Sequence, residues 1–347
     1  MHNFVIEKYP IGPKMEKKIE NWLVEVCRNC FESGIRKIES LRESGSARQY
    51  YRVYLDSATV ILCVSTNIGE NKTFVKLTRY LLEKGISVPA IFAVSENFEY
   101  YLLEDLGNDD FLMLISGPER NEKLKKYIGE IISELVSFQQ LPQQEWKEIV
   151  EFPPLDEVLI SYDCRYALEN FFKVSGKTLD ESKLHEEFLN LQKKLMAYPQ
   201  ELWGLMFRDF QSRNIMIKKK PYFIDYQSSR RGPGIYDLVS FAWQAKANFT
   251  EKERGEITDC YIINLTKRGI YAEDCIKSNL PYWAMFRILQ TLGAYGLRGL
   301  KEGKIHFIES IPYALANLRH LLQYNNLIDD FSEIYRLIQQ DPVLEKK

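Results

Sequence analysis

The sequence predicts an α+β protein with two lobes, a small N-terminal lobe built on an antiparallel sheet and a larger, mainly helical C-terminal lobe. Short apolar or alternating runs dominate about the first hundred residues, which is the pattern of strands. Apolar residues at helical spacing dominate the remainder. The length of 347 residues suits two units of this kind. We expect a nucleotide-binding lobe over residues 1–104 and a helical lobe with the catalytic loop and acceptor site over residues 105–347.

The composition is that of an ordinary globular protein, with 45% hydrophobic and 27% charged residues. The formal net charge of −2 does not favour nucleic acid or a membrane surface as a partner. The longest apolar runs, such as Ala58–Val64, have the length of a strand and not of a membrane span. We therefore expect neither a nucleic-acid nor a membrane partner. The sequence does not indicate an oligomeric state.

The cysteines and the N-terminus indicate a cytoplasmic protein. Residues 1–18 lack the continuous apolar stretch of a signal peptide. The six cysteines are scattered, and only Cys27 and Cys30 are close together. Their spacing fits one face of an amphipathic helix, so we expect core cysteines and not a zinc site. None of the four histidines forms a His-x-x-x-His pair, and none is assigned a metal or base role.

The N-terminal lobe should begin with a helix, because apolar residues recur at helical spacing from Met15 to Cys30 and Gly34 would end it. A second helix is expected over residues 70–83, before Gly85. The expected strands are 35–41, 51–55, 58–64, 90–94 and 99–103.

Helical periodicity dominates the C-terminal lobe after Gly107. The one exception is a group of strands over residues 205–227. The expected helices are 124–140, 155–172, 182–198, 235–247, 251–268, 281–297, 305–323 and 327–340.

Residues 205–227 are expected to form an apolar strand, a polar loop and a short hairpin that ends near an aspartate. The pattern Asp209-x-x-x-x-Asn214, a hairpin and then Asp225 is typical of phosphoryl transfer from ATP. Asp209 would accept the proton of the acceptor hydroxyl. Asn214 and Asp225 would hold Mg²⁺ through oxygen ligands. The alternative is a solvated hairpin with incidental carboxylates.

Two loops of the N-terminal lobe are candidates for nucleotide binding. The first includes Gly45, Ser46, Ala47 and Arg48, whose backbone N–H groups and small side chains would cover the ATP phosphates. The alternative is an ordinary hairpin turn. The second, over Glu104, Asp105 and Leu106, would join the lobes and meet the adenine edge, or is a plain connecting loop.

Residues around the catalytic pattern are candidates for acceptor binding. They are Arg213, Gln227, Arg230 and Arg231, and guanidinium groups suit phosphate oxygens. Solvated surface is the alternative for the arginine pair. Asp237 would cap the following helix or brace the catalytic loop by hydrogen bonds, and we prefer a supporting role for it.

The segments Phe207–Asn214 and Phe223–Asp237 resemble the aminoglycoside phosphotransferase/choline kinase superfamily. Within it they are most similar to bacterial kinases that phosphorylate the anomeric hydroxyl of N-acetylmuramate and N-acetylglucosamine. Ser46–Arg52 and Leu102–Gly107 resemble the same group. The resemblance implies a protein-kinase-like fold, ATP or GTP with Mg²⁺, and a small sugar as acceptor. It also implies Asp209 as the base and the other two residues of the pattern as metal ligands.

Two positions depart from the pattern. Phe207 stands where the family usually has a histidine with a mostly structural role. The third strand, Ala58–Val64, carries no lysine, whereas kinase-like folds usually place one there to bind the phosphates. Arg48 is our candidate to replace that charge, and Glu70 would then have a different partner or none.

The sequence thus favours a Mg-ATP-dependent kinase acting on a sugar hydroxyl, in which the acceptor itself is not determined. One alternative keeps the enzyme but gives it an aminoglycoside, choline or another alcohol as acceptor. The other is a catalytically silent protein that binds nucleotide as a scaffold, a hypothesis motivated by the absent lysine.

Overall fold

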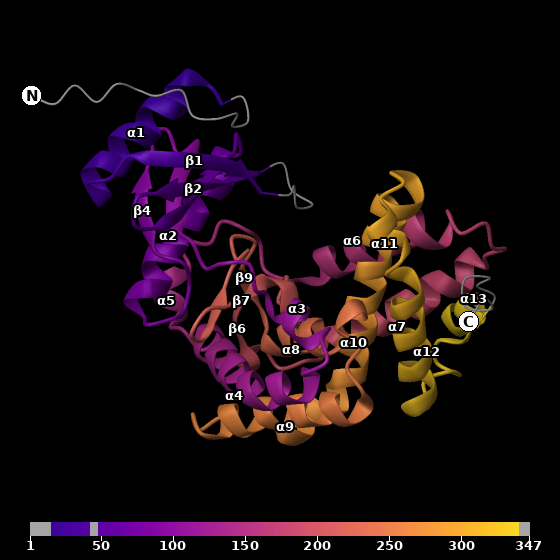
Figure 1. Ribbon diagram of the computed structural model, residues 1–347. Helices are drawn as coiled ribbons and strands as arrows, with labels where there is room; N and C mark the ends of the chain where they lie inside the picture. The colour runs from indigo at the N-terminus through magenta and orange to yellow at the C-terminus, as the bar shows by residue number, and fades with distance from the viewer. Residues whose placement is uncertain (1–14, 42–47, 340–347) are drawn as a thin grey trace, which may run out of the picture. The chain divides into compact units, whose positions relative to one another are not determined.

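The computed structural model describes residues 15–41 and 48–339 (Figure 1). The contacts divide the chain into two units. Unit 1 comprises Met1–Asp109 and Met216–Gln227, and unit 2 comprises Asp110–Ile215 and Ser228–Lys347. The segment after the catalytic loop therefore belongs with the N-terminal unit, although the sequence expectation drew a single boundary after residue 104.

Unit 1 is built on a five-stranded antiparallel sheet with the strand order β1-β2-β3-β5-β4. All five expected strands are present. Their bounds are β1 (Ile35–Ser40), β2 (Gln49–Leu55), β3 (Thr59–Val64), β4 (Ile91–Val94) and β5 (Tyr100–Glu104). Because neighbouring strands are joined mostly by short connections, the alternating pattern in the sequence was sufficient to predict them.

Each face of this sheet is covered by one helix, α1 (Lys17–Phe31) or α2 (Ile68–Glu83) (Figure 1). The core under α1 is apolar. It includes Ile19, Leu23, Cys27, Val53, Leu62 and Leu102. On the opposite face, Phe74 of α2 stacks on Tyr101 with 5.1 Å between ring centroids. Cys63 pairs with both Tyr50 and Tyr101 across the strands, so these three side chains share the α2 face.

The cysteines do not behave alike. Cys27 is buried under the sheet, as expected, but Cys30 is exposed, so the expectation of core cysteines is wrong for the second of the pair. No cysteine forms a disulfide within the described residues.

The hairpin of the catalytic pattern is confirmed as β7 (Ile215–Ile217) and β8 (Pro221–Phe223). It is fastened to unit 1 by backbone hydrogen bonds at both strands. The amide of Ile217 donates to the carbonyl of Asp109 at 2.8 Å, and the amide of Phe223 donates to the carbonyl of Ser87 at 2.8 Å.

Unit 2 is mainly helical and carries one two-stranded sheet, β6 (Trp203–Met206) with β9 (Arg230–Pro233). Its α-helices are α3 (Phe111–Ile115), α4 (Arg120–Gln139), α5 (Gln143–Trp146), α6 (Glu157–Ala167), α7 (Glu181–Met196), α8 (Gly234–Ala242), α9 (Glu251–Thr266), α10 (Glu273–Tyr295), α11 (Ile305–Ile308), α12 (Ile311–Tyr324) and α13 (Ser332–Gln339). Short 3₁₀ or π turns are η1 (Leu168–Phe172), η2 (Gln200–Leu202), η3 (Ser212–Asn214), η4 (Ala245–Ala247) and η5 (Gly296–Lys301).

Prolines account for the two main differences from the expected helices. The helix expected to start at Pro281 starts at Glu273 and continues through the proline, because burial of residues on both sides, such as Ile276 and Trp283, outweighs the lost hydrogen bond. The expected single helix over 305–323 is broken into α11 and α12, and Pro312 lies in the first turn of α12, where a proline needs no amide hydrogen.

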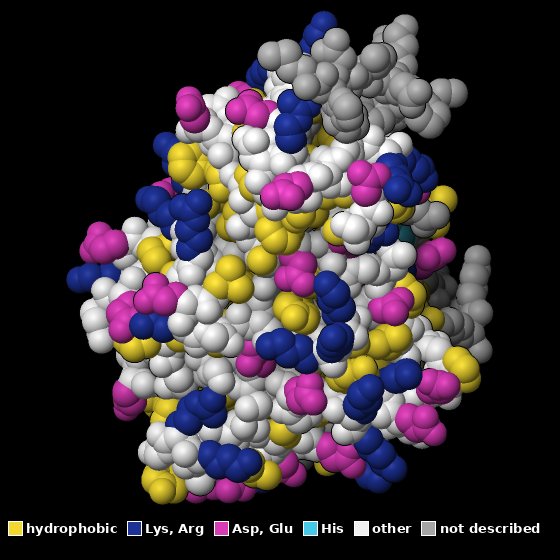
Figure 2. Space-filling model, turned by 60° about the vertical axis from the view of Figure 1, so that its left-hand side comes forward, with side chains coloured by type: hydrophobic (Ala, Val, Ile, Leu, Met, Phe, Trp, Pro, Cys, Tyr) yellow, Lys and Arg dark blue, Asp and Glu magenta, His cyan; other side chains and the backbone are white. Residues whose placement is uncertain are grey.

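Acidic and basic side chains are interspersed over the face drawn in Figure 2. Among the residues with described positions, no helix combines the length and the apolar character needed to cross a bilayer.

Candidate active site

The catalytic loop follows β6 in unit 2 and is held by a buried carboxylate. Asp237 of α8 accepts hydrogen bonds from the backbone amides of Phe207 at 2.8 Å and Arg208 at 3.0 Å. Arg208 has a φ of 81°, a left-handed conformation that is strained for a residue with a side chain. These two hydrogen bonds stabilise that conformation, so the expected bracing role of Asp237 is confirmed.

Asp237 is itself the centre of a buried network. Gln139 of α4 donates to its carboxylate at 2.9 Å and accepts from the hydroxyl of Tyr261 at 2.7 Å. Gly234 makes room for this network, because a Cβ there would lie 2.5 Å from the Tyr261 hydroxyl. Burial raises the pKa of Asp237 to about 7, against the opposing effect of these donors.

The side chain of Arg208 anchors the same loop to α6. Its Nη2 lies 2.5 Å from Oδ2 of Asp163, and the two side chains are only 8% and 6% exposed. Its guanidinium also lies 5.1 Å from the ring centre of Tyr236. A buried ion pair of this kind is costly to break, since removing one partner leaves the other charge uncompensated.

Asp209, the predicted base, presents a carboxylate that is 40% exposed. Arg287 of α10 donates from Nη2 to its Oδ1 at 3.2 Å and from Nη1 to the Tyr236 hydroxyl at 3.1 Å. Arg287 also donates to Gln290. Partial burial acts to raise the pKa of Asp209, but the Arg287 and Arg208 charges outweigh it and hold the pKa below its ordinary value. The carboxylate is thus ionised at neutral pH, as a proton acceptor must be.

Asn214, a predicted metal ligand, lies on the same loop. Its Nδ2 donates to the backbone carbonyl of Asp209 at 2.8 Å. The amide group is thereby oriented by its nitrogen, which leaves the oxygen as the atom of the side chain suited to a hard cation. Unit 2 therefore brings two of the three residues of the catalytic pattern together.

Asp225, the other predicted metal ligand, belongs to unit 1. It has a φ of 68°, so Asp225 adopts the left-handed conformation, as Arg208 does. Gln227 donates to its Oδ1 at 2.8 Å. Tyr226, between them, is buried, with 2.7 Å between its hydroxyl and that of Thr78. The expected acceptor-binding role of Gln227 stays a prediction, and its amide also holds Asp225, a candidate metal ligand.

Of the residues expected around the phosphates, Gly45, Ser46 and Ala47 lie outside the described residues. Arg48 is described and buried, and its Nη2 forms an ion pair with Oε1 of Glu70 at 3.1 Å. The different partner expected for Glu70 is therefore Arg48 itself.

The segment Glu104–Leu106, which was expected to connect the lobes, is held by side-chain contacts. Both oxygens of the Asp105 carboxylate contact Arg52 of β2, at 2.7 Å and 3.0 Å. Glu104 forms an ion pair with Lys218 at 3.0 Å, and Leu106 is buried. These side chains are occupied within unit 1, so only their backbone is suited to meet a nucleotide base.

Two of the expected acceptor residues lie on a strand of unit 2. Arg230 and Arg231 are part of β9 and pair with Met206 and Leu205 of β6. The Arg230 guanidinium lies 5.0 Å from the ring centre of Phe152 and is 8% exposed. Burial and the neighbouring positive charge of Arg208 lower its pKa. It is thus a cation without a close carboxylate partner among the described residues.

The other arginine of β9 and the arginine of the catalytic loop are engaged locally. Arg231 stacks over Trp203, with 5.1 Å from the guanidinium carbon to the ring centre. Arg213 donates to Oε1 of Gln211 at 2.8 Å and is exposed.

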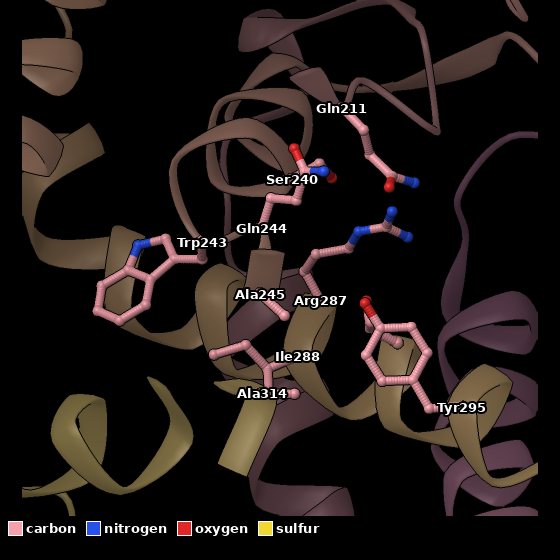
Figure 3. A pocket seen from close by; sticks show the side chains of 10 residues that line it. Gln211, Ser240, Trp243, Gln244, Ala245, Arg287, Ile288, Tyr295 and Ala314 are labelled. Carbon is pink, nitrogen blue, oxygen red and sulfur yellow. The ribbon is translucent and has the colours of Figure 1, made fainter. Parts of the chain in front are cut away.

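A cavity of about 20 Å³ lies behind the catalytic loop and is lined by Gln211, Ser240, Trp243, Gln244, Arg287 and Tyr295, among others. In Figure 3 the side chains of Gln211 and Arg287 approach the same space from opposite sides. This volume suits about one water molecule, so the cavity is too small for a sugar. It matters because Arg287 links it to Asp209.

No cluster of three or more His, Cys, Asp or Glu side chains with metal-binding geometry occurs among the described residues. The predicted ligand set is one carboxylate and one amide, which is a set of hard oxygen donors, as a phosphate-bridging cation requires. Asn214 and Asp225 therefore fit Mg²⁺ by their chemistry.

The chain is similar to a known family and to named kinases. Residues 37–269 match the model of the phosphotransferase enzyme family. An N-acetylmuramate/N-acetylglucosamine kinase of Neisseria meningitidis is 23% identical over 322 residues, which cover 88% of this chain and 90% of the relative. One of Pseudomonas aeruginosa is 22% identical over 279 residues, covering 77% and 78%.

Solved structures match the fold. Choline kinase from Cryptosporidium parvum superposes with a TM-score of 0.59 at 15% identity, covering 92% of this chain and all (100%) of the other. Plasmodium vivax ethanolamine kinase gives 0.58 at 15% identity, covering 89% of each chain. The predicted protein-kinase-like α+β fold is thereby confirmed. Since the family match spans more than half of its length, the chain belongs to the phosphotransferase enzyme family and is an enzyme that transfers a phosphoryl group to a hydroxyl acceptor.

Proposed function

We propose that this chain is a Mg-ATP-dependent kinase that phosphorylates the anomeric hydroxyl of an amino sugar such as N-acetylmuramate or N-acetylglucosamine. The observation that carries the proposal is the state of Asp209, an exposed, ionised carboxylate held by Arg287 on a strained loop. The relatives named as N-acetylmuramate/N-acetylglucosamine kinases support the choice of acceptor.

In this proposal Asp209 accepts the proton of the sugar hydroxyl as the phosphoryl group is transferred. The contact with Arg287 fixes one carboxylate oxygen and leaves the other to face the hydroxyl. Asn214 and Asp225 hold Mg²⁺, which when bound neutralises charge on the phosphates. ATP is the proposed donor, with GTP as the alternative. The backbone of Glu104–Leu106 binds its base.

The charge around the catalytic loop favours a neutral or anionic acceptor over a polycationic one. Arg287, Arg213 and Arg230 all contribute positive charge to this region. A polycationic aminoglycoside would be repelled, whereas the carboxylate of N-acetylmuramate would be attracted. We therefore rank an anionic amino sugar first, a neutral amino sugar second, and choline or an aminoglycoside last.

The test is an acceptor panel with purified protein and Mg-ATP, in which ADP release is measured with N-acetylmuramate, N-acetylglucosamine, choline and kanamycin. We expect release with the amino sugars. A product phosphorylated at the anomeric hydroxyl is no longer a reducing sugar, so loss of the reducing end should match ADP release mole for mole. ADP release with choline or kanamycin alone would refute the proposed acceptor.

Two variants separate the proposed roles. Asp209→Ala should lower turnover by about 10²–10⁴-fold while Mg-ATP affinity stays within about twofold of the wild type. Asp225→Ala should instead remove the Mg²⁺ dependence of ATP binding. Asp259→Ala, which removes an exposed carboxylate that pairs only loosely with Lys277, is the matched control. Measurable ATP binding without turnover on any acceptor would favour the scaffold alternative.

A further inference from the structure

We propose that Arg48 supplies, from the start of β2, the phosphate-binding cation that a protein kinase carries as a lysine on its third strand, and that Glu70 is its helix partner. The ligand class is the phosphate chain of a nucleoside triphosphate. The inference rests on the proposed function, because it assumes that the chain binds Mg-ATP.

The position of the absent lysine can be identified on β3. In protein kinases the lysine ends the motif V-A-I-K on the third strand and pairs with a glutamate of the following helix. The third strand here reads Val60-Ile61-Leu62-Cys63, so Cys63 stands at the fourth position. Cys63 is fully buried on the face of the sheet that α2 covers.

Arg48 reaches the same place from the neighbouring strand. Tyr50 pairs directly with Cys63 on the face of the sheet that α2 covers. Arg48 immediately precedes β2, and its contact with Glu70 of α2 places its side chain on the same face. The guanidinium carbon lies 5.9 Å from the ring centre of Phe74 in α2. The charge of a third-strand lysine is thus replaced by a side chain that starts one strand away.

Glu70 of α2 is the partner of Arg48, and it is held in position by a second contact. Glu70 lies in the first turn of α2, and its Oε1 is 3.1 Å from Nη2 of Arg48. Its other oxygen accepts a hydrogen bond from Nδ2 of Asn67 at 2.9 Å. The glutamate therefore holds one edge of the guanidinium, as the helix glutamate holds the lysine in a protein kinase.

The remaining donors of Arg48 point to an anionic ligand. Its side chain is only 3% exposed, and its Nε has no hydrogen-bond acceptor among the described residues. A buried donor without an acceptor costs free energy, and a guanidinium has five N–H donors in a planar fork that fits phosphate oxygens. A phosphate oxygen of the nucleotide would provide the missing acceptor.

The experiment compares the affinities of the full-length protein for Mg-ATP and for adenosine by isothermal titration calorimetry. In Arg48→Met we expect Mg-ATP affinity to fall about 10- to 100-fold, the loss of one or two charge-assisted hydrogen bonds, with adenosine affinity unchanged within about twofold. Arg48→Lys should fall between Met and wild type, because it keeps the charge but loses the fork. The matched control is Arg36→Met, which removes an exposed ion pair between Arg36 of β1 and Asp56.

The decisive variant places the positive charge on β3 instead of at residue 48. Arg48→Met combined with Cys63→Lys restores a lysine at the third-strand position beside Glu70, and we expect it to recover Mg-ATP affinity by at least about tenfold over Arg48→Met. Equal losses for ATP and adenosine in Arg48→Met would overturn the proposal, because they would mean that Arg48 only supports the packing of α2. Undiminished ATP affinity in Arg48→Met would also overturn it. A wild-type protein that binds no Mg-ATP would instead refute the proposed function.

Discussion

The catalytic loop of unit 2 and the connector of unit 1 each follow a strand. Arginine side chains hold both segments, but the surroundings of these contacts differ. The loop over Phe207–Asn214 is held by side chains of three different helices, through Asp163, Asp237 and Arg287. The connector over Glu104–Asn108 is held by Arg52, which lies on a strand of the same sheet.

The difference lies in what surrounds the contacts. The side chains that hold the catalytic loop are almost entirely buried, and Arg208 forms a buried ion pair with Asp163 of α6. Two of the three groups that Arg52 contacts, Asn108 Oδ1 and the Gly107 carbonyl, are at exposed positions, where water can replace a lost partner. We therefore expect the loop that carries the proposed base to be fixed more firmly than the connector.

The largest effect is expected from Asp163→Ala, which leaves the buried guanidinium of Arg208 without its partner. Breaking a buried pair by removing one side typically costs about 3–5 kcal/mol, and we expect a loss of this size in the free energy of unfolding, measured by urea denaturation. Asp259→Ala, at an exposed pair, should change it by less than about 0.5 kcal/mol. Similar losses in the two variants would contradict the contrast.

Asp237→Asn should destabilise the protein by about 1–3 kcal/mol at neutral pH, because its amide nitrogen would face backbone N–H groups that now donate to a carboxylate. The size of this destabilisation should depend on pH. Burial raises the pKa of Asp237 from 3.8 to about 7, so the folded state binds a proton that the unfolded state has lost in this range.

The contribution of Asp237 to stability is therefore fully present below about pH 4 and declines as the pH rises to about 7. Relative to Asp237→Asn, which cannot titrate, the wild type should lose up to about 1.4 kcal/mol per pH unit in this window. Urea denaturation of both proteins from pH 4 to 8 measures this difference. A difference that is constant with pH, or that grows as the pH rises, would contradict the raised pKa.

Arg287→Met removes the hydrogen bond that Arg287 donates to the carboxylate of Asp209. If the proposed function is correct, kcat should fall about 10- to 100-fold with little change in Mg-ATP affinity, because a charge-assisted hydrogen bond that fixes the base is lost. Arg287→Lys should recover part of the loss. A change in the KM for ATP with an unchanged kcat would show that Arg287 acts on the nucleotide and not on the base.

The smallest effect is expected from Arg52→Met in the connector. We expect about 1–2 kcal/mol in the free energy of unfolding. The Asp105 carboxylate that Arg52 pairs with is only 5% exposed, but the Asn108 and Gly107 oxygens are accessible to water. Arg36→Met, at a fully exposed pair on β1, should cost less than about 0.5 kcal/mol. A loss in Arg52→Met as large as that in Asp163→Ala would show that the two segments are held alike.

The sequence by itself determined the features that depend on neighbouring residues. The alternation of apolar residues predicted the five strands of unit 1 and the hairpin after Asn214, because side chains on a strand face opposite sides in turn. The spacing of Asp209, Asn214 and Asp225 indicated phosphoryl transfer, and the family match agrees with that reading. Asp237 was expected to brace the loop, since it follows the pattern closely in sequence.

Only the tertiary structure identified the partners that come from far along the chain. Arg287 and Asp163 lie on helices whose sequences read as ordinary amphipathic segments, and nothing in their spacing singles them out. The pairing of Arg48 with Glu70, the strand that carries Arg230 and the return of residues 216–227 to unit 1 were equally undetermined. Periodicity records which face of an element is buried, but which side chains meet there depends on how the elements pack, and that is a property of the whole fold.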